Sequence, residues 1–427
     1  MAGGVFEQMS GYAVKKGAPA EERGSDTASK GAAAQHEKGV LYQGPWETLH
    51  DGFNEHVRRC ARALSEAGLP VRLRSFVPRQ FGKVPFETRD PRDECKDLLE
   101  TTIAQTVCHI CQVVPSEGIF HHLMSHRYYS GEQLAYLNSL KVLSTVFERT
   151  AIPQHDIQAL ERAGQVWVAC KANAKMLKDQ GLERVRVVPI PYLADDPLLA
   201  FEGRERIPGP IRFYSIGKWE PRKEHRNALG SFLRAFKPGE ASYYLKTSPS
   251  LPECEGYPDG PEAALRVWLT DPVVQQNGWN AESVGRSLFI IKKYLPEEQL
   301  RELHRTCDVY VSLARGEGFD MPAFDSKLAG NLMVYTPSGG PQDFAGEFDV
   351  EVPTSGEVTC HSFYRWGEES LYLDYEVEDA SRALREAFEL AHDGQRQRGM
   401  SLDPFSMKSV GKRMAQYVQE LRDRAGV

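Results

Sequence analysis

Two carboxylates eight residues apart flank the start of a predicted helix within the segment 315–330, RGEGFDMPAFDSKLAG. Glu317 opens a glycine-containing turn, Pro322 begins the helix, and Asp325 lies inside it, ahead of a C-cap position at Gly330. The free N–H groups and the positive dipole end at the helix start would face an anion, and the carboxylates would accept hydrogen bonds from sugar hydroxyls. This pattern predicts a site for a polyol that carries phosphates.

Alternating strands and helices must position these acids. The chain has 427 residues, about three times a typical domain length, which predicts two large domains or three small ones. The alternation indicates an α/β protein with parallel sheets. The elements expected in the first half are strands over residues 40–43, 70–76, 107–114, 141–147, 166–169 and 184–189 and a helix over 52–68.

An acidic, Pro/Gly-rich linker is expected over residues 194–210. Beyond it we expect strands over 211–219, 241–248, 288–295, 308–314 and within 331–344, with helices over 224–236, 296–307 and 405–423. The predicted domains are therefore a disordered tail (1–39), a first domain (40–200), a second domain (201–404) and a closing helix (405–427). An insert at 249–287 carries a short helix near 261–269, and its Trp268 and Trp279 are assigned to the core, an oligomer contact or a lid.

Composition excludes several classes of protein. A net charge of -7 gives no general electrostatic footprint for nucleic acid or anionic membranes, and no apolar run approaches the roughly 20 residues of a membrane span. The polar tail resembles neither a secretory signal nor a transit peptide, so we expect a cytoplasmic protein with reduced thiols. Cys108 and Cys111 lack a second nearby pair, which favours a buried strand over a zinc site.

The segment 315–330 resembles the E-x7-E signature of retaining GT-B glycosyltransferases, family 4 in particular. Other segments resemble the same family: STVFERTAIP and VWVACKANAKMLKDQGLERVRVVP at the end of the first domain, SIGKWEPRKEHRNALGSFLRAF opening the second, and the helix from Phe405. Together they cover roughly residues 40–427. The resemblance implies a GT-B fold, in which two Rossmann-like domains face a cleft and the closing helix crosses back onto the first domain.

The resemblance also implies roles for individual residues. Lys218 and Lys223 match a basic pair on the donor's diphosphate, where lysine supplies positive charge to the leaving group; a solvated basic turn is the alternative. Glu317 matches an acid near the sugar ring, and these three residues are the expected catalytic groups. Asp325 matches an acid that binds ribose hydroxyls. The other expected donor contacts are Gly217, Arg222, Gly318, Phe319, Asp320, Met321 and, from the first domain, Gly44.

Two positions depart from the family pattern. Position 325 is usually Glu, so Asp325 is one methylene shorter. Position 320 is usually glycine, and the Asp320 carboxylate could bind a sugar hydroxyl, restrict the donor, or cap the following helix. Tyr294 and Leu295 end a strand where the family's base-binding backbone lies, and they either flank the nucleobase or belong to the core. The turn at 338–340 either admits a ligand closely or is an ordinary turn.

Polar residues of the first domain are candidate acceptor contacts. They are Glu47, His50, Asp51 and Asn54 after the first strand, and His121 and His122 further along. A metal pair of His122 with His126 is an alternative, but no adjacent acid completes it. We assign no catalytic histidine, because His109 falls inside a predicted strand.

The resemblance implies transfer of a hexose from a UDP- or GDP-sugar to an acceptor hydroxyl, with retention, by a front-face mechanism that needs no metal or other cofactor. The acceptor is a glycan, a lipid carrier or a small molecule, without stable membrane insertion, and a homo-oligomer is possible. Two alternatives stay open. The basic segment 72–92 could touch DNA in a transferase acting on modified bases. Asp320 and Asp325 could instead mark a non-enzymatic scaffold that binds nucleotide sugars. A GT-B epimerase or phosphorylase is a more distant alternative.

Overall fold

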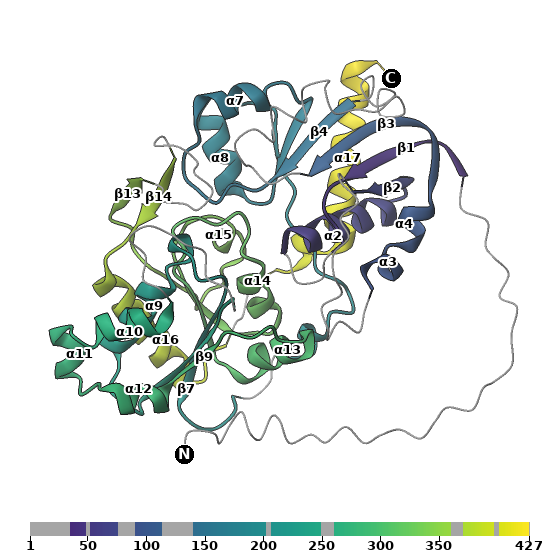
Figure 1. The fold of residues 1–427 in the computed structure, drawn as a ribbon. Coiled ribbons are helices and arrows are strands. Elements are labelled where there is room, and N and C mark those ends of the chain that lie inside the picture. Colours follow the sequence, from purple (N-terminus) through teal and green to yellow (C-terminus); the bar gives the residue numbers. More distant parts are fainter. Residues whose placement is uncertain are drawn as a thin grey trace, which may run out of the picture.

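Short runs of Val, Ile, Leu, Tyr and Trp form buried strands, and amphipathic helices cover them on both faces. The structure is a computed structural model that describes residues 35–47, 52–75, 90–112, 140–201, 206–248, 260–359, 370–396 and 401–426. These residues form two six-stranded parallel sheets in separate halves of the molecule (Figure 1). The predicted α/β class with parallel sheets is confirmed.

The first sheet has the strand order β2-β1-β3-β4-β5-β6. Its strands are β1 (Gln35–Gln43), β2 (Val71–Arg74), β3 (Thr102–Gln112), β4 (Leu140–Thr145), β5 (Gln165–Val168) and β6 (Val185–Val187). The accompanying helices are α2 (Gly52–Glu66), α3 (Pro91–Glu94), α4 (Lys96–Glu100), α7 (Gln154–Leu160) and α8 (Lys171–Asp179). Cys108 and Cys111 are buried within β3, as predicted.

The first strand begins earlier than predicted. Residues 35–39, assigned to the tail, belong to β1 and pair in register with the start of β3. Their side chains at 36–38 are exposed, so apolar patterning gives no signal there, although the backbone pairs fully. The register shifts after Gly39, where a Cβ atom would lie 2.7 Å from the carbonyl oxygen of Pro70.

The second sheet has the strand order β12-β11-β10-β7-β8-β9. Its strands are β7 (Ile211–Ile216), β8 (Ala241–Lys246), β9 (Leu288–Ile291), β10 (Val309–Ser312), β11 (Leu332–Tyr335) and β12 (Val350–Glu351). Its helices are η4 (Pro221–Lys223), α9 (His225–Ala235), α10 (Pro261–Trp268), α11 (Pro272–Gln276), α12 (Ala281–Ser287), α13 (Glu297–Thr306), α14 (Met321–Leu328), α15 (Pro341–Phe344) and α16 (Val377–His392).

Two segments differ from the sequence prediction. The predicted linker contains a short 3-10 helix, η3 (Pro197–Phe201), because Leu198 is buried in the core of the second half. An antiparallel ribbon of β13 (Gly356–Thr359) and β14 (Leu371–Asp374) was not predicted, and it packs against the first half through a hydrogen bond from Thr150 N to Leu371 O of 2.9 Å.

The insert packs onto α9. The ring of Trp268 covers Gly230, where a Cβ atom would lie 2.0 Å from the indole, and its Nε1 donates to Arg226 O at 2.9 Å. Trp279 is buried and donates to Phe236 O at 2.7 Å. Of the roles weighed for these tryptophans, membership of the core is the one the structure supports.

The closing helix α17 (Met407–Ala425) lies beside α2 in the first half, as Figure 1 shows in yellow. Ser406 caps its N-terminus by accepting from Ser409 N at 3.2 Å. Val410, Met414 and Val418 are buried in the same core as the apolar face of α2. Among the described residues, no helix combines the length and apolar character needed to cross a membrane.

In each sheet the first strand of that half lies inside the sheet, and the strand order reverses beside it. β1 has β2 on one side and β3 on the other. In the same way, β7 has β8 on one side and β10 on the other. In open parallel sheets the crevice beyond the carboxyl ends of such strands is the usual ligand site. This geometry directs attention to the loops that follow β1, β7 and β10.

Candidate active site

The loop after β10 carries Glu317 into close contact with the first half. Gly316 lies against the loop that follows β4, where a Cβ atom would stand 2.1 Å from the carbonyl oxygen of Glu148. A Cβ atom at Gly318 would stand 2.4 Å from the Cβ of Val146. Because glycine has no Cβ, the two backbones approach at a distance that other residues would not allow.

The turn at 338–340 closes the other side of the same loop. Glu317 N donates to Ser338 O at 3.0 Å. A Cβ atom at Gly339 would lie 1.8 Å from Glu317 O, and one at Gly340 would lie 2.1 Å from Phe319 O. The close approach that the sequence suggested for a ligand is therefore made by the Glu317 loop itself.

Arg222, on the turn after β7, fixes the carboxylate of Glu317. The guanidinium donates to Glu317 Oε1 at 2.8 Å and to Glu220 Oε1 at 2.6 Å, and it pairs with Glu148 Oε1 at 3.0 Å. It also donates to Gly316 O at 2.9 Å. Burial alone would lower the pKa of Arg222, but the three carboxylates raise it well above its ordinary value.

Lys223 lies beside the same carboxylate. Its Nζ contacts Glu317 Oε1 and lies 3.8 Å from Asp320 Oδ1. Burial would lower the pKa of Lys223, but these two carboxylates raise it overall, so the side chain stays charged. Lys218, by contrast, is exposed and pairs with no carboxylate among the described residues. In the basic turn, Lys218 is therefore exposed to solvent, whereas Arg222 and Lys223 orient Glu317.

Gly217 leaves space for a buried imidazole. A Cβ atom there would lie 2.9 Å from Nε2 of His225, whose ring stacks on Trp219 with centroids 6.3 Å apart. Burial, and then the neighbouring Lys223, lowers the pKa of His225 to about 3, so the ring is neutral. The sequence predicted no role for His225 or Glu148, although an acid shortly after a buried strand is a usable signal.

The carboxylate of Asp320 is buried and points toward Ser312, whose hydroxyl donates to Oδ2 at 2.5 Å. It makes no hydrogen bond to its own helix, so of the three roles weighed for Asp320, helix capping is wrong. Phe319 is buried in an aromatic cluster and contributes only backbone to the site. Met321 begins α14 and lies opposite the first half, with Sδ 3.3 Å from where a Cβ of Gly52 would stand.

Asp325 lies inside α14 and faces the first half. Burial raises the pKa of its carboxyl to about 7, against the opposing effect of Arg59 on α2, and Asp196 raises it further. Oδ1 of Asp325 is buried and has no hydrogen-bond partner within the described residues. An acceptor oxygen without a donor at this face is what a hydroxyl ligand would satisfy.

The remaining predicted donor contacts differ in exposure. Tyr294 is 52% exposed, whereas Leu295 is 3% exposed and belongs to the core, so only its backbone is free to meet a base. Gly44 packs against α2, where a Cβ would lie 2.9 Å from Cγ2 of Val57.

Four of the six acceptor-side candidates, His50, Asp51, His121 and His122, lie outside the described residues. Of the other two, Glu47 accepts from Trp46 N at 2.8 Å, and Asn54 is buried on α2. Most of the basic segment 72–92 also falls outside, as does His126. Among the described residues, no group of three or more His, Cys, Asp or Glu side chains is arranged to hold a metal ion.

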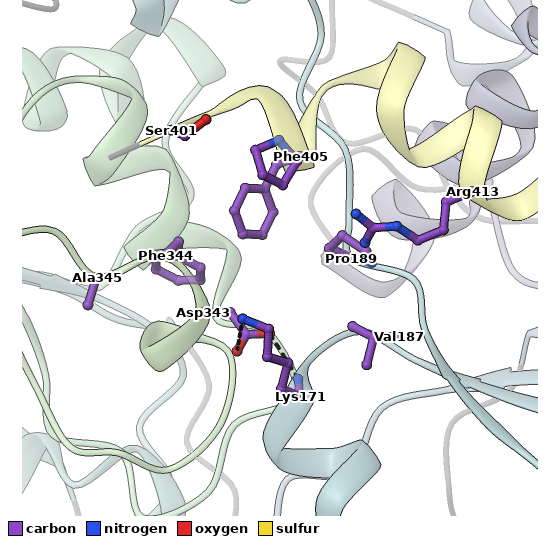
Figure 2. Close-up of a pocket in the computed structure, with 10 residues that line it drawn as sticks. Lys171, Val187, Pro189, Asp343, Phe344, Ala345, Ser401, Phe405 and Arg413 are labelled. Atoms are coloured by element: carbon purple, nitrogen blue, oxygen red, sulfur yellow. Dashed lines mark hydrogen bonds and ion pairs between the residues drawn. The ribbon is translucent and has the colours of Figure 1, made fainter. Parts of the chain in front are cut away.

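A pocket of about 250 Å³ lies where α8, α15 and the start of α17 meet (Figure 2). Phe344 and Phe405 line one side, and Arg413 lines another. At its edge Asp343 accepts a hydrogen bond from Lys171 N at 2.9 Å, so a carboxylate of the second half caps a helix of the first. This contact belongs to the junction of the halves rather than to the Glu317 loop.

No protein-family model matches the chain, and no curated protein matches it. WaaB, a lipopolysaccharide outer core galactosyltransferase solved in its apo form, is similar over 90% of this chain and 99% of its own, with a TM-score of 0.54 and 11% identity. Anabaena HepE in complex with UDP-glucose is similar over 92% of this chain and 100% of its own, with a TM-score of 0.50 and 8% identity.

This chain has the GT-B fold. The predicted fold class, two Rossmann-like halves with a closing helix, is thereby confirmed. In this GT-B chain the Glu317 loop and the basic turn belong to the second half, and Glu148 reaches them from the first.

Proposed function

We propose that the chain is a retaining glycosyltransferase, similar to family 4, that moves a hexose from a UDP- or GDP-sugar to an acceptor hydroxyl. One observation carries the proposal. Glu317 stands on the loop just before the N-terminus of α14, and Arg222 and Lys223 hold its carboxylate in place. A fixed acid, a basic turn and a helix start therefore lie side by side.

This arrangement suits the charges that glycosyl transfer develops. The departing diphosphate gains negative charge, which Lys218, Lys223 and the N–H groups at the start of α14 would stabilise without a metal. The sugar gains positive charge, which a carboxylate close to the ring would stabilise. Glu317 accepts from two cations, so its oxygens are weak nucleophiles, which favours front-face substitution over a covalent intermediate.

The similar structures support the choice of donor. HepE was solved with UDP-glucose and with UDP and glucose, and WaaB is a galactosyltransferase. A UDP-hexose is therefore the first donor to test, with a glycan, lipid carrier or small molecule as acceptor. The six described cysteines are all buried free thiols, which fits the proposed cytoplasmic location.

The proposal is tested with a panel of UDP-, GDP-, ADP- and TDP-sugars, without added metal. Thermal shift measures binding, and release of free sugar measures slow hydrolysis. We expect one nucleotide class to stabilise the protein and sugar release to be lost in Glu317→Ala. Glu282→Ala is the matched control, because Glu282 is an exposed acid on α12 that pairs only with Arg286 among the described residues.

Each contrary outcome selects an alternative. Binding without sugar release, unchanged by Glu317→Ala and by any acceptor tried, supports the scaffold. Strong DNA binding that weakens steeply with salt supports the nucleic-acid acceptor. No thermal shift with any donor contradicts the proposed function.

A further inference from the structure

Asp320 has a backbone conformation that costs an L-residue energy. Its φ of 62° and ψ of 69° lie in the left-handed region. Among the described residues, only Glu224 shares a positive φ without being glycine. Glycine adopts this conformation freely, so the backbone at position 320 gives no reason for an aspartate.

Helix capping gives no reason for the aspartate either. Asp320 precedes α14 but its carboxylate does not cap that helix. Instead it turns inward, where Oδ2 accepts from the Ser312 hydroxyl at 2.5 Å and the side chain is only 2% exposed. Oδ1 is buried without a hydrogen-bond partner among the described residues, 3.8 Å from Lys223 Nζ.

A buried carboxylate with one unsatisfied oxygen is costly unless a donor completes it. Lys223 is shared with Glu317, and no other cation forms an ion pair with Asp320 among the described residues. Burial raises the pKa of Asp320, against the opposing effect of Lys223, which reflects the same shortage of partners. The unsatisfied Oδ1 would therefore be stabilised by a hydrogen-bond donor from outside the chain.

We propose that Asp320 is a specificity-determining residue, whose Oδ1 accepts a hydrogen bond from one hydroxyl of the donor sugar. A carboxylate accepts and does not donate, so it would repel a phosphate oxygen and favour a sugar hydroxyl. The neighbouring Glu317 loop is where the proposed function puts the sugar ring. The inference rests on that proposed function and names the group on the donor that position 320 selects.

The test uses UDP-glucose and GDP-mannose, each with its 2-, 3-, 4- and 6-deoxyfluoro analogues, because fluorine replaces a hydroxyl without donating a hydrogen bond. Hydrolysis kcat/KM is measured for the wild type, Asp320→Asn and Asp320→Gly. In the wild type we expect one analogue to lose about 10- to 100-fold relative to its parent, since the carboxylate is left buried and unpaired. The same analogue should lose less than about threefold in Asp320→Gly.

The stability of the variants and the pattern of discrimination separate this role from a merely structural one. Glycine relieves the left-handed backbone, so Asp320→Gly should fold with an unchanged or higher Tm, and Asn also tolerates this conformation. Equal discrimination against every analogue in the wild type and both variants overturns the inference while leaving the proposed function intact. Absence of binding and hydrolysis with both parent donors overturns the proposed function and this inference with it.

Discussion

The guanidinium of Arg222 lies 2.8 Å from the carboxylate of Glu317 and joins it to Glu148 in the other half of the molecule. Arg222 also pairs with Glu220, so one buried cation balances three acids. The ion pairs therefore connect the two halves at the candidate site, and the geometry of Glu317 depends on a network that spans both halves.

Arg222→Met should destabilise the protein strongly, because it leaves Glu148 and Glu220 without their cation and removes one of the two cations that hold Glu317. Breaking a buried pair from one side costs about 3–5 kcal/mol. Burial raises the pKa of Glu148 against the opposing effect of Arg222, and removing Arg222 would raise it further, so the loss should be largest above pH 7 and shrink as pH falls toward 5. Urea denaturation at both pH values measures the effect.

Arg286→Met is the matched control for that experiment. Arg286 is exposed on α12 and pairs with Glu282 one turn away. Its removal should change the unfolding free energy by less than about 0.5 kcal/mol at either pH. Equal stability of the two variants would show that the Arg222 network contributes nothing to the fold.

Gly316→Ala should impair turnover more than folding. The new methyl group would meet the carbonyl oxygen of Glu148 at 2.1 Å, and because both atoms belong to short loops the Glu317 backbone must shift. A displacement on the order of 1 Å at a reacting centre costs about 10²-fold in rate. Hydrolysis of the donor that the panel identifies provides the measurement, with Tm recorded beside it.

Gly285→Ala separates this effect from the general effect of replacing glycine. Gly285 lies inside α12 with no atom within 4 Å of the added Cβ, so alanine should stabilise the helix by about 0.5–1 kcal/mol and leave turnover unchanged. If Gly316→Ala kept full activity, the tight contact between the loops would have no catalytic role.

The sequence predicted most elements but not how they meet. The E-x7-E segment, a helix that starts next to Pro322 and the β3 strand through Cys108 all followed from local patterns that report local geometry. The bridging role of Arg222 did not, because its partners lie 74 residues before it (148 to 222) and 95 residues after it (222 to 317). In the same way, a glycine in a loop indicates that another backbone can approach closely, but it does not indicate which segment that is.

Some sequence predictions differ from the structure because tertiary contacts, which the hydrophobic pattern does not report, decide the outcome. Polar residues at 36–38 are exposed on a strand whose backbone is paired, so they resembled a tail. Helix capping was one alternative for Asp320 because aspartate favours that position, whereas the carboxylate lies toward Ser312. Tertiary contacts decided both cases over local preference.

Asp325 should make stability and donor binding depend on pH in opposite directions. Its folded pKa of about 7 exceeds the ordinary value of 3.8, so the folded state binds the proton more tightly and stability falls as pH rises from about 4 to 7. The charged groups that face it are Arg59, Asp196, Glu55 and Glu297. Ionised Asp325 is the proposed ribose acceptor, so donor affinity should weaken as pH falls below 7.

Asp325→Asn should therefore raise Tm at pH 8 and change it little at pH 4, while weakening donor binding at pH 8. Asp393→Asn serves as the control, because Asp393 is exposed at the end of α16 and should change neither quantity. Thermal shift with and without donor at both pH values separates the two effects. A Tm gain at pH 4 as large as that at pH 8 would contradict the titration of Asp325.

Lys223→Ala should lower turnover more than donor affinity, because lysine stabilises charge that is greatest in the transition state. Lys223 also holds Glu317, so the acid would lose one of its two cations while Arg222 keeps it in place. Calorimetric donor binding and steady-state kinetics are measured together, with Lys175→Ala as an exposed control on α8. A loss confined to donor affinity, with kcat unchanged, would assign Lys223 to ground-state binding and remove it from the proposed catalytic set.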